Sequence, residues 1–381
     1  MKTRDQHLFD DGPKRMLALD GGGIRGALTL GYLARMESIL RERHGGGPDF
    51  RLSDYFDLIG GTSTGSIIAT GLALGFSVDK LTRIYVELGE RIFEEGFLHF
   101  GVFGAKFAKE PLVQALTTHF GDEPLGSDKL RTGLMVMTKR LDTGSPWLLH
   151  NNPRGQFYDV HPGYSGTPNR DMLLRNVVRA STAAPHYFEP EFLQIAPGHS
   201  GAFVDGGISP YNNPSMQMLM LATCSGYSLN WPFGEDRLLL ISAGTGHVTT
   251  ALRPEDVMKM PAVKLAAQSV MSIMEDANWL GQAILQWMAR SSTGWTIDSE
   301  VGDLQSDALG GGPAMISYQR YDVALRPDWI KDTIGMALST QECAALYAMD
   351  NPANIAKLTQ LGQNAAAVQI DPAHFPAAFD M

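Results

Sequence analysis

The sequence predicts an α/β protein of three layers (α/β/α), in which helices cover both faces of a mainly parallel central sheet. Over the first 75 residues, short apolar runs that fit buried strands alternate with segments whose apolar residues recur at helical spacing. This alternation predicts parallel strands joined by helical crossovers. After residue 251 the chain becomes rich in Met and Ala and keeps a helical period. We therefore expect a core over residues 1–250 and a C-terminal helical extension over residues 251–381, packed on the same domain.

The composition is that of a globular protein without a strongly basic surface. Of the 381 residues, 44% are hydrophobic and 19% are charged, so a sizeable core can be buried. The net charge of −10 offers no field for a nucleic acid polymer and repels an anionic membrane on average, which leaves local, peripheral contact with a membrane. An apolar signal segment and a run of about 18 apolar residues are both missing, so we expect neither export nor a membrane span. Two cysteines without metal-type spacing indicate reduced thiols and a cytoplasmic protein.

The order of elements follows from the apolar pattern. A strand over residues 14–19 ends at Asp20, and a glycine-rich loop over residues 21–26 turns into a helix. A second strand over residues 55–59 leads through a turn into a helix over residues 66–73. Further strands are expected over residues 134–138, 147–149, 202–204 and 238–242, and further helices over 171–181, 263–289, 333–348 and 353–367.

The turn after the second strand carries a serine in the pattern Gly-x-Ser-x-Gly. Gly61 and Gly65 stand on either side of Ser63 and let neighbouring backbone pass close to a strained strand-to-helix turn. The hydroxyl then projects from the sheet edge beside a helix N-terminus, whose free N–H groups and partial positive charge favour a nucleophile there.

The loop over residues 21–26 allows two interpretations. It follows a strand and starts a helix, so Gly21, Gly22 and Gly23 can present N–H groups to a developing oxyanion, with Arg25 fixing the loop or adding positive charge. The loop also fits the dinucleotide-binding pattern Gly-x-Gly-x-x-Gly. That pattern needs an acidic residue about 20 positions on, at the end of a second strand, whereas the positions there precede any second strand. The oxyanion interpretation is therefore favoured.

Three motifs, in this order, resemble those of the patatin-like phospholipases. They are Asp20-Gly-Gly-Gly-Ile-Arg-Gly26, Gly61-Thr-Ser-Thr-Gly65 and Asp205-Gly-Gly207, and the stretches 180–185, 212–214 and 241–246 extend the resemblance over roughly residues 14–246. The resemblance implies a patatin-like fold for the core. It also implies a lipid acyl hydrolase of the phospholipase A or lysophospholipase type, which acts on a lipid or phospholipid substrate through an acyl-enzyme.

The resemblance assigns a role to each motif residue. Ser63 would be the nucleophile, and Asp205 would take its proton without the help of a histidine. Burial must then raise the pKa of the aspartate enough for it to accept a proton near neutral pH. The oxyanion hole would comprise Gly22, Gly23 and Arg25, and the other motif glycines are Gly21, Gly26, Gly61, Gly65, Gly206 and Gly207. No cofactor is implied, and the sequence contains no zinc or calcium motif, so hydrolysis without a metal is expected.

Three alternatives stay open. An esterase of the α/β-hydrolase type would use a Ser–His–Asp triad with His247, which follows a predicted strand, or with His186. A regulated effector would stay inactive until a ligand engages the region after residue 251, and it would resemble bacterial patatin-like phospholipases that cyclic oligonucleotides switch on. A lipid-binding module without activity would leave the serine, the aspartate and the glycine loop unexplained.

Aromatic side chains recur every three or four residues between Glu90 and Pro111. This period is typical of a helix face packed on the core. The glycines that interrupt it, with Lys106 and Lys109 nearby, also fit a flap that touches acyl chains or a bilayer.

Overall fold

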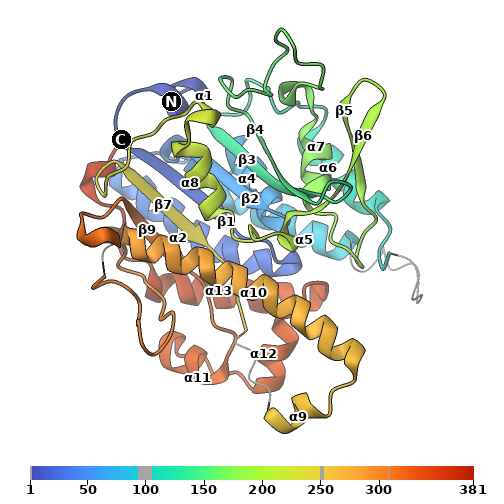
Figure 1. Ribbon diagram of the computed structural model, residues 1–381. Coiled ribbons are helices and arrows are strands. Elements are labelled where there is room, and N and C mark those ends of the chain that lie inside the picture. The colour runs from blue at the N-terminus through green and yellow to red at the C-terminus, as the bar shows by residue number, and fades with distance from the viewer. Residues whose placement is uncertain (1, 93–104, 249–252, 308) are drawn as a thin grey trace.

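The computed structural model, described over residues 2–92, 105–248, 253–307 and 309–381, is built around one mixed β-sheet (Figure 1). The strands lie in the order β5-β6-β3-β2-β1-β7-β9-β8, with β4 paired to β3. Their bounds are β1 (Lys14–Leu19), β2 (Leu58–Thr62), β3 (Gly133–Arg140), β4 (Ser145–His150), β5 (Glu191–Ala196), β6 (His199–Asp205), β7 (Leu238–Ala243), β8 (Ala289–Arg290) and β9 (Ile316–Tyr321). Strands β1, β2, β3, β7, β8 and β9 run parallel, whereas β4 and β6 pair antiparallel with β3, and β5 with β6. The predicted, mainly parallel sheet is confirmed.

Helices cover the sheet on both faces. The α-helices of the described ranges are α1 (Arg4–Phe9), α2 (Gly26–Arg43), α3 (Leu52–Tyr55), α4 (Thr64–Ala73), α5 (Val78–Glu90), α6 (Glu110–Phe120), α7 (Leu174–Ser181), α8 (Ser215–Thr223), α9 (Pro254–Met258), α10 (Ala262–Met288), α11 (Pro327–Trp329), α12 (Thr340–Leu346) and α13 (Ile355–Gln369), and α9, α11 and α12 lie away from the sheet (Figure 1). None of those in the described ranges is long and apolar enough to cross a bilayer.

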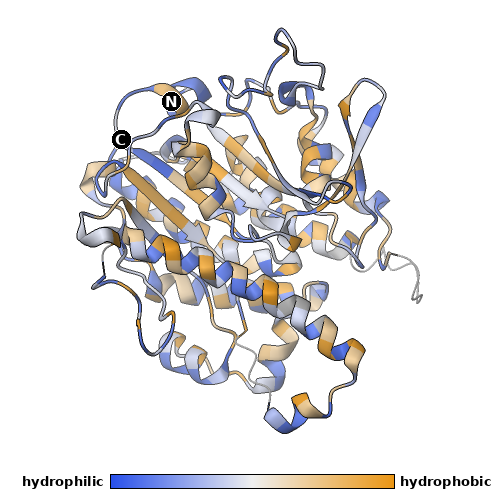
Figure 2. Cartoon of the chain, in the orientation of Figure 1, coloured by the Kyte–Doolittle hydropathy of each residue, from blue (hydrophilic) through white to orange (hydrophobic). Residues whose placement is uncertain are grey.

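Alternate side chains of the central strands enter two separate cores. Leu17 and Leu19 of β1 pack in the larger core with residues of α2, α4, α5 and α13, whereas Met16 and Ala18 pack in a smaller core with residues of α8 and α10. Successive side chains of a strand point to opposite faces, so a sheet buried on both faces needs nearly continuous apolar strands. Figure 2 shows such strands at the centre, and shows α10 alternating between hydrophobic and hydrophilic residues. The predicted three-layer arrangement follows from this pattern.

The parallel strands bring three loops to one edge of the sheet. Leu19, the last residue of β1, pairs with Gly61 of β2 on one side and with Ala243, the last residue of β7, on the other. The glycine loop, the serine turn and the loop after β7 therefore start side by side. This is the edge at which parallel α/β sheets bind their ligands.

Some elements differ from the sequence prediction. The second strand begins only at Leu58, because residues 52–55 form helix α3, in which Leu52 and Tyr55 are fully buried. Strand β9 lies in the region expected to be helical and pairs with β7 inside the sheet. Strand β5, which forms a hairpin with β6, was not predicted either. The division of the chain at residue 250 stays a prediction.

The structure describes only part of the aromatic stretch between Glu90 and Pro111. Its residues 93–104 lie outside the described residues, and the two interpretations of that segment stay predictions. Phe107, at its end, is buried in the larger core and stacks on Tyr187, with ring centroids 6.3 Å apart.

Candidate active site

Ser63 occupies a tight turn between β2 and α4. Its backbone has φ 53° and ψ −125°, a conformation that costs free energy for any residue with a side chain. The turn persists because the chain around it is closely packed. A Cβ on Gly61 would lie 2.1 Å from the carbonyl oxygen of Gly65, and a Cβ on Gly65 would lie 2.3 Å from that of Leu19. Only glycine fits at these two positions, as the motif predicts.

Asp205 ends strand β6 and faces the serine. Oγ of Ser63 donates a hydrogen bond of 2.5 Å to Oδ2 of Asp205, and Oδ1 accepts the N–H of Gly207 at 2.7 Å. The aspartate is only 4% exposed. Burial raises the pKa of Asp205 to about 6, against the lowering effect of its hydrogen bonds from Ser63 and Gly207. The carboxylate can therefore stay ionised at neutral pH and still be basic enough to accept a proton.

The glycine loop between β1 and α2 passes beside the serine. A Cβ on Gly21 would lie 3.1 Å from the Cβ of Ser63. The N–H of Gly21 donates to the carbonyl of Asn212 at 3.2 Å, whereas the N–H groups of Gly22 and Gly23 have no hydrogen-bond partner among the described residues. Buried N–H groups are rarely left unpaired, so two such donors at one cavity indicate a place for an acceptor from a ligand.

The carbonyl groups of the same loop are anchored on its opposite side. Oγ1 of Thr245 donates to the carbonyl of Gly21 at 2.9 Å, and Nε of Arg25 donates to that of Gly22 at 3.3 Å. The carbonyl of one residue and the N–H of the next belong to one planar trans peptide and point in opposite directions. Holding these two carbonyls from behind therefore directs the N–H groups of Gly22 and Gly23 away from Thr245 and Arg25.

Arg25 is a buried cation whose hydrogen bonds hold the glycine loop in place. Besides the carbonyl of Gly22, it reaches that of Gly246, to which Nη1 donates at 2.7 Å. Its guanidinium also lies over the ring of Tyr347, 4.4 Å from the centroid. It is 6% exposed and has no carboxylate within salt-bridge distance in the described part of the chain, so its direct contacts are carbonyl dipoles and an aromatic ring. The carboxylates of Asp20 and Glu275 act on its charge from farther away.

A cavity of about 330 Å³ lies in front of the serine and the aspartate. Its far wall is apolar and includes Ile67, Leu88, Ile92, Leu112, Phe188 and Met274. Of the predicted site residues, Gly21, Gly22, Gly23, Arg25, Ser63, Asp205 and Gly207 line it. Gly61, Gly65 and Gly206 instead allow close backbone packing around it, and Gly26 leaves room for the side chains of Tyr85 and Thr64. A mostly apolar cavity with a few convergent polar groups is the usual form of a small-molecule site.

Helix α7 supplies two side chains to which the sequence analysis assigned no role. Oγ of Ser181 accepts the N–H of Ser63 at 2.9 Å and donates to the carbonyl of Met137 at 2.7 Å, so it holds the strained turn in place. Arg179 is almost fully buried and donates to the carbonyl of Glu189 at 3.0 Å. The sequence signal that could have found Ser181 was the stretch 180–185, which is part of the family resemblance. Arg179 stands directly before this stretch.

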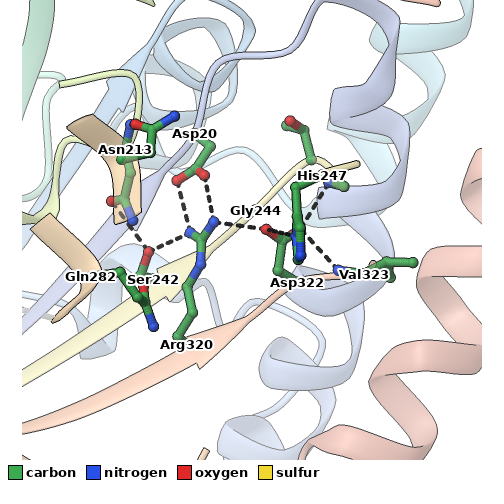
Figure 3. Close-up of polar contacts among 12 residues, drawn as sticks. Asp20, Asn213, Ser242, Gly244, His247, Gln282, Arg320, Asp322 and Val323 are labelled. Atoms are coloured by element: carbon green, nitrogen blue, oxygen red, sulfur yellow. Dashed lines mark hydrogen bonds and ion pairs between the residues drawn. The ribbon is translucent and has the colours of Figure 1, made fainter. Parts of the chain in front are cut away.

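A buried ionic network lies behind the glycine loop (Figure 3). Arg320 of β9 donates to both carboxylate oxygens of Asp20, at 2.9 and 2.7 Å, and to Oδ2 of Asp322 at 2.8 Å. Oδ1 of Asp322 accepts the N–H of Gly246 at 2.8 Å, and Nδ1 of His247 lies 3.2 Å from Oδ2. The network ties together the carboxyl ends of β1, β7 and β9.

Neither histidine considered for a triad contacts the serine. His247 belongs to the ionic network, and His186 is exposed. In the described ranges, Oγ of Ser63 hydrogen-bonds to Asp205 and to no histidine. The geometry therefore favours a Ser–Asp pair over a Ser–His–Asp triad.

Comparison with known proteins gives consistent matches. The model of the patatin-like phospholipase family matches residues 17–219. A cGAMP-activated phospholipase of Vibrio cholerae is 33% identical over 213 residues, covering 53% of this chain and 55% of the relative. A cUMP-AMP-activated phospholipase of Escherichia coli is 32% identical over 211 residues, covering 55% and 59%. Patatin-T5 of Solanum tuberosum is 25% identical over 251 residues, covering 61% and 60%. The chain thus spans little more than half the length of the curated relatives that it matches.

The segment that the family model matches is more than half of the chain. It runs from β1 into α8 and contains the glycine loop, the serine turn and the aspartate at the end of β6. The chain therefore belongs to the patatin-like phospholipase family.

Proposed function

We propose that the protein is a lipid acyl hydrolase of the phospholipase A or lysophospholipase type. The observation that carries the proposal is the hydrogen bond of 2.5 Å from Oγ of Ser63 to Oδ2 of Asp205, at the wall of an apolar cavity of about 330 Å³. The family match and the relatives named as phospholipases support a phospholipid substrate. A substrate of this kind requires peripheral contact with a membrane.

In the acylation step, Oγ of Ser63 attacks the carbonyl carbon of the ester while Asp205 takes the hydroxyl proton. The developing negative charge on the carbonyl oxygen is stabilised by the N–H groups of Gly22 and Gly23 and by the nearby charge of Arg25. The tetrahedral intermediate collapses when the alcohol leaves with the proton that Asp205 has accepted. The acyl group is then bound to the serine as an ester, with its chain against the apolar wall.

In the deacylation step, water takes the place of the departed alcohol. Asp205 accepts a proton from the water, whose oxygen attacks the acyl carbon. The second tetrahedral intermediate returns the proton to Oγ of Ser63 and releases the fatty acid. One pair of side chains thus serves both steps, and the proton count returns to its starting value.

The test measures fatty acid released from mixed phospholipid vesicles and product released from a short-chain nitrophenyl ester, both in the presence of a chelator. Ser63→Ala and Asp205→Ala should each lose at least about 1,000-fold in rate, because removing a catalytic member leaves mainly binding and the oxyanion hole. Ser165→Ala, at an exposed serine, is the matched control and should keep full activity. Hydrolysis that survives in Ser63→Ala would refute the proposed nucleophile.

We propose as a second function that a nucleotide ligand regulates this hydrolase. Two of the relatives are named for activation by cGAMP and by cUMP-AMP, and each is more than 30% identical to this chain over more than half of its length. Fatty acid release from vesicles is therefore to be compared with and without cyclic GMP–AMP. If the protein releases fatty acid at the same rate with and without cyclic GMP–AMP, the proposed regulation is wrong and the proposed hydrolase activity stands.

A further inference from the structure

We infer that a second cavity, behind the glycine loop, is a nucleotide site that places a base against Trp279 and Trp295 and a phosphate toward Arg25. The inference rests on the proposed regulation and gives it a location. The cavity has a volume of about 110 Å³ and opens to the surface, so it holds one ring system rather than an acyl chain. Arg25, Tyr347 and Glu275 line both this cavity and the larger one, and therefore form the wall between them.

Two half-buried tryptophans give the cavity its aromatic surface. Both indole rings meet the imidazole of His247 edge to face, Trp295 at 4.9 Å and Trp279 at 5.6 Å between centroids. Trp295 is also stacked on Trp329, with centroids 5.5 Å apart and planes inclined by 19°. These contacts fix the orientation of the rings while leaving part of each surface uncovered. Rigid aromatic faces of this kind bind nucleobases by stacking.

Hydrogen-bonding groups line the same space. In the described part of the chain, Nε2 of His247 and the amide nitrogen of Asn278 have no hydrogen-bond partner, although each side chain is held in place through its other polar atom. The carboxylate of Glu275 accepts the hydroxyl of Tyr347 at 3.3 Å and has further lone pairs toward the cavity. A nucleobase edge carries both donors and acceptors, and these groups can pair with both.

Arg25 is the cation of the wall that a ligand phosphate would contact. The two buried carboxylates in the wall, Asp20 and Asp322, are already paired with Arg320 (Figure 3). Arg25 has no such partner within the described ranges. A phosphate would give this buried guanidinium a direct ionic partner, because a guanidinium presents several N–H donors suited to phosphate oxygens. The carboxylate of Glu275, on the same wall, would repel a phosphate. We therefore expect Glu275 to contact the nucleobase rather than the phosphate.

The site is coupled to catalysis by the two peptide units of the loop. Thr245 and Arg25 both line the second cavity, and they hold the carbonyls of Gly21 and Gly22. The N–H groups of the same two peptide units are the proposed oxyanion donors. A ligand that draws Arg25 toward its phosphate changes the hold on the carbonyl of Gly22 and turns the peptide that carries the N–H of Gly23. Ligand binding and oxyanion geometry are linked by this rotation.

Binding is tested by titration calorimetry on the full chain carrying Ser63→Ala, so that the result does not depend on hydrolysis. The probes are cyclic GMP–AMP, cyclic UMP–AMP, AMP and inorganic phosphate. We expect at least one cyclic dinucleotide to bind, and expect Trp295→Leu and Trp279→Leu each to weaken its binding at least tenfold. The matched control is Trp287→Leu, at an exposed tryptophan of α10 that does not line the cavity. Melting temperatures show which variants are folded, and either of the two cavity tryptophans suffices for the test.

The results distinguish the nucleotide site from the proposed hydrolase activity. Equal binding in all folded tryptophan variants would place the ligand elsewhere and overturn the inference. No binding of any nucleotide, together with intact hydrolysis in the wild-type chain, would overturn the site and leave the proposed hydrolase standing. Coupling is tested on the catalytically intact chain, where the bound dinucleotide should change fatty acid release at least tenfold in the wild type and in Trp287→Leu but not in Trp295→Leu. Binding without any change in rate would refute the coupling.

Discussion

In the proposed mechanism, the protonation of Asp205 decides whether Ser63 can be activated. Burial raises the pKa of this carboxyl group to about 6, so it is mostly protonated below that pH and mostly ionised above it. Only the ionised form can accept the hydroxyl proton. We therefore expect kcat/KM for a short-chain ester to rise with pH, to reach half its maximum near pH 6, and then to level off. A pH–rate profile that is flat across this range would contradict the assignment of Asp205 as the base.

Ser181 contacts the backbone of the proposed nucleophile, and we expect it to affect the reaction through this contact. Its hydroxyl is the hydrogen-bond acceptor for the N–H of Ser63, in a turn that is strained. Ser181→Ala should lower kcat by about 10- to 100-fold, because a small displacement of a reacting group has effects of this size. KM and the midpoint of the pH profile should stay close to wild type, since Asp205 keeps its partners. An unchanged kcat would show that the turn holds its geometry without this hydroxyl.

At the scale of elements, helices α2 and α13 cross with almost no space between their backbones. A Cβ on Gly31 would lie 2.4 Å from the carbonyl carbon of Gly362. Gly31→Ala must therefore push the helices apart, and we expect it to lower the free energy of unfolding by about 1–3 kcal/mol. The matched control is Gly281→Ala in α10, where a Cβ meets nothing within 4 Å and where we expect a gain of about 0.5–1 kcal/mol. Urea denaturation measures the free energy of unfolding of both variants. Changes of the same sign in the two variants would contradict the packing argument.

The elements also show what the sequence could predict and why the rest was missed. Strand β1 was predicted with its exact bounds, because an apolar run between a polar segment and a glycine loop has few alternatives. The serine turn and Asp205 were found from local motifs, and the structure brings them into contact, although their catalytic roles stay proposals. Strand β9 was missed because Gln319 and Arg320 interrupt its apolar residues. Nothing in the local sequence indicates that this arginine finds its partner, Asp20, 300 residues away in the chain.

At the scale of the whole molecule, Arg320 joins the C-terminal part of the chain to the first strand. Its removal would leave Asp20 and Asp322 buried without their positive partner. Arg320→Met should therefore lower the free energy of unfolding by about 3–5 kcal/mol, the usual cost of breaking one side of a buried ion pair. Arg326→Met removes an exposed arginine from the same region and should change stability by less than about 0.5 kcal/mol. Chemical denaturation of both variants checks this, and equal stability would show that the network contributes little.

The supports of the glycine loop lie far along the chain from the loop itself. The backbone N–H of Ile24 donates to the carbonyl of Met349 at 2.9 Å, and the ring under Arg25 belongs to Tyr347. A ribosome makes the serine almost 300 residues before these supports, and domains fold as their residues emerge. The growing chain therefore contains its proposed nucleophile long before the proposed oxyanion donors are held in place. For a protein whose proposed substrate is the lipid of membranes, this order of assembly delays the proposed activity until the segment with Tyr347 and Met349 has been made.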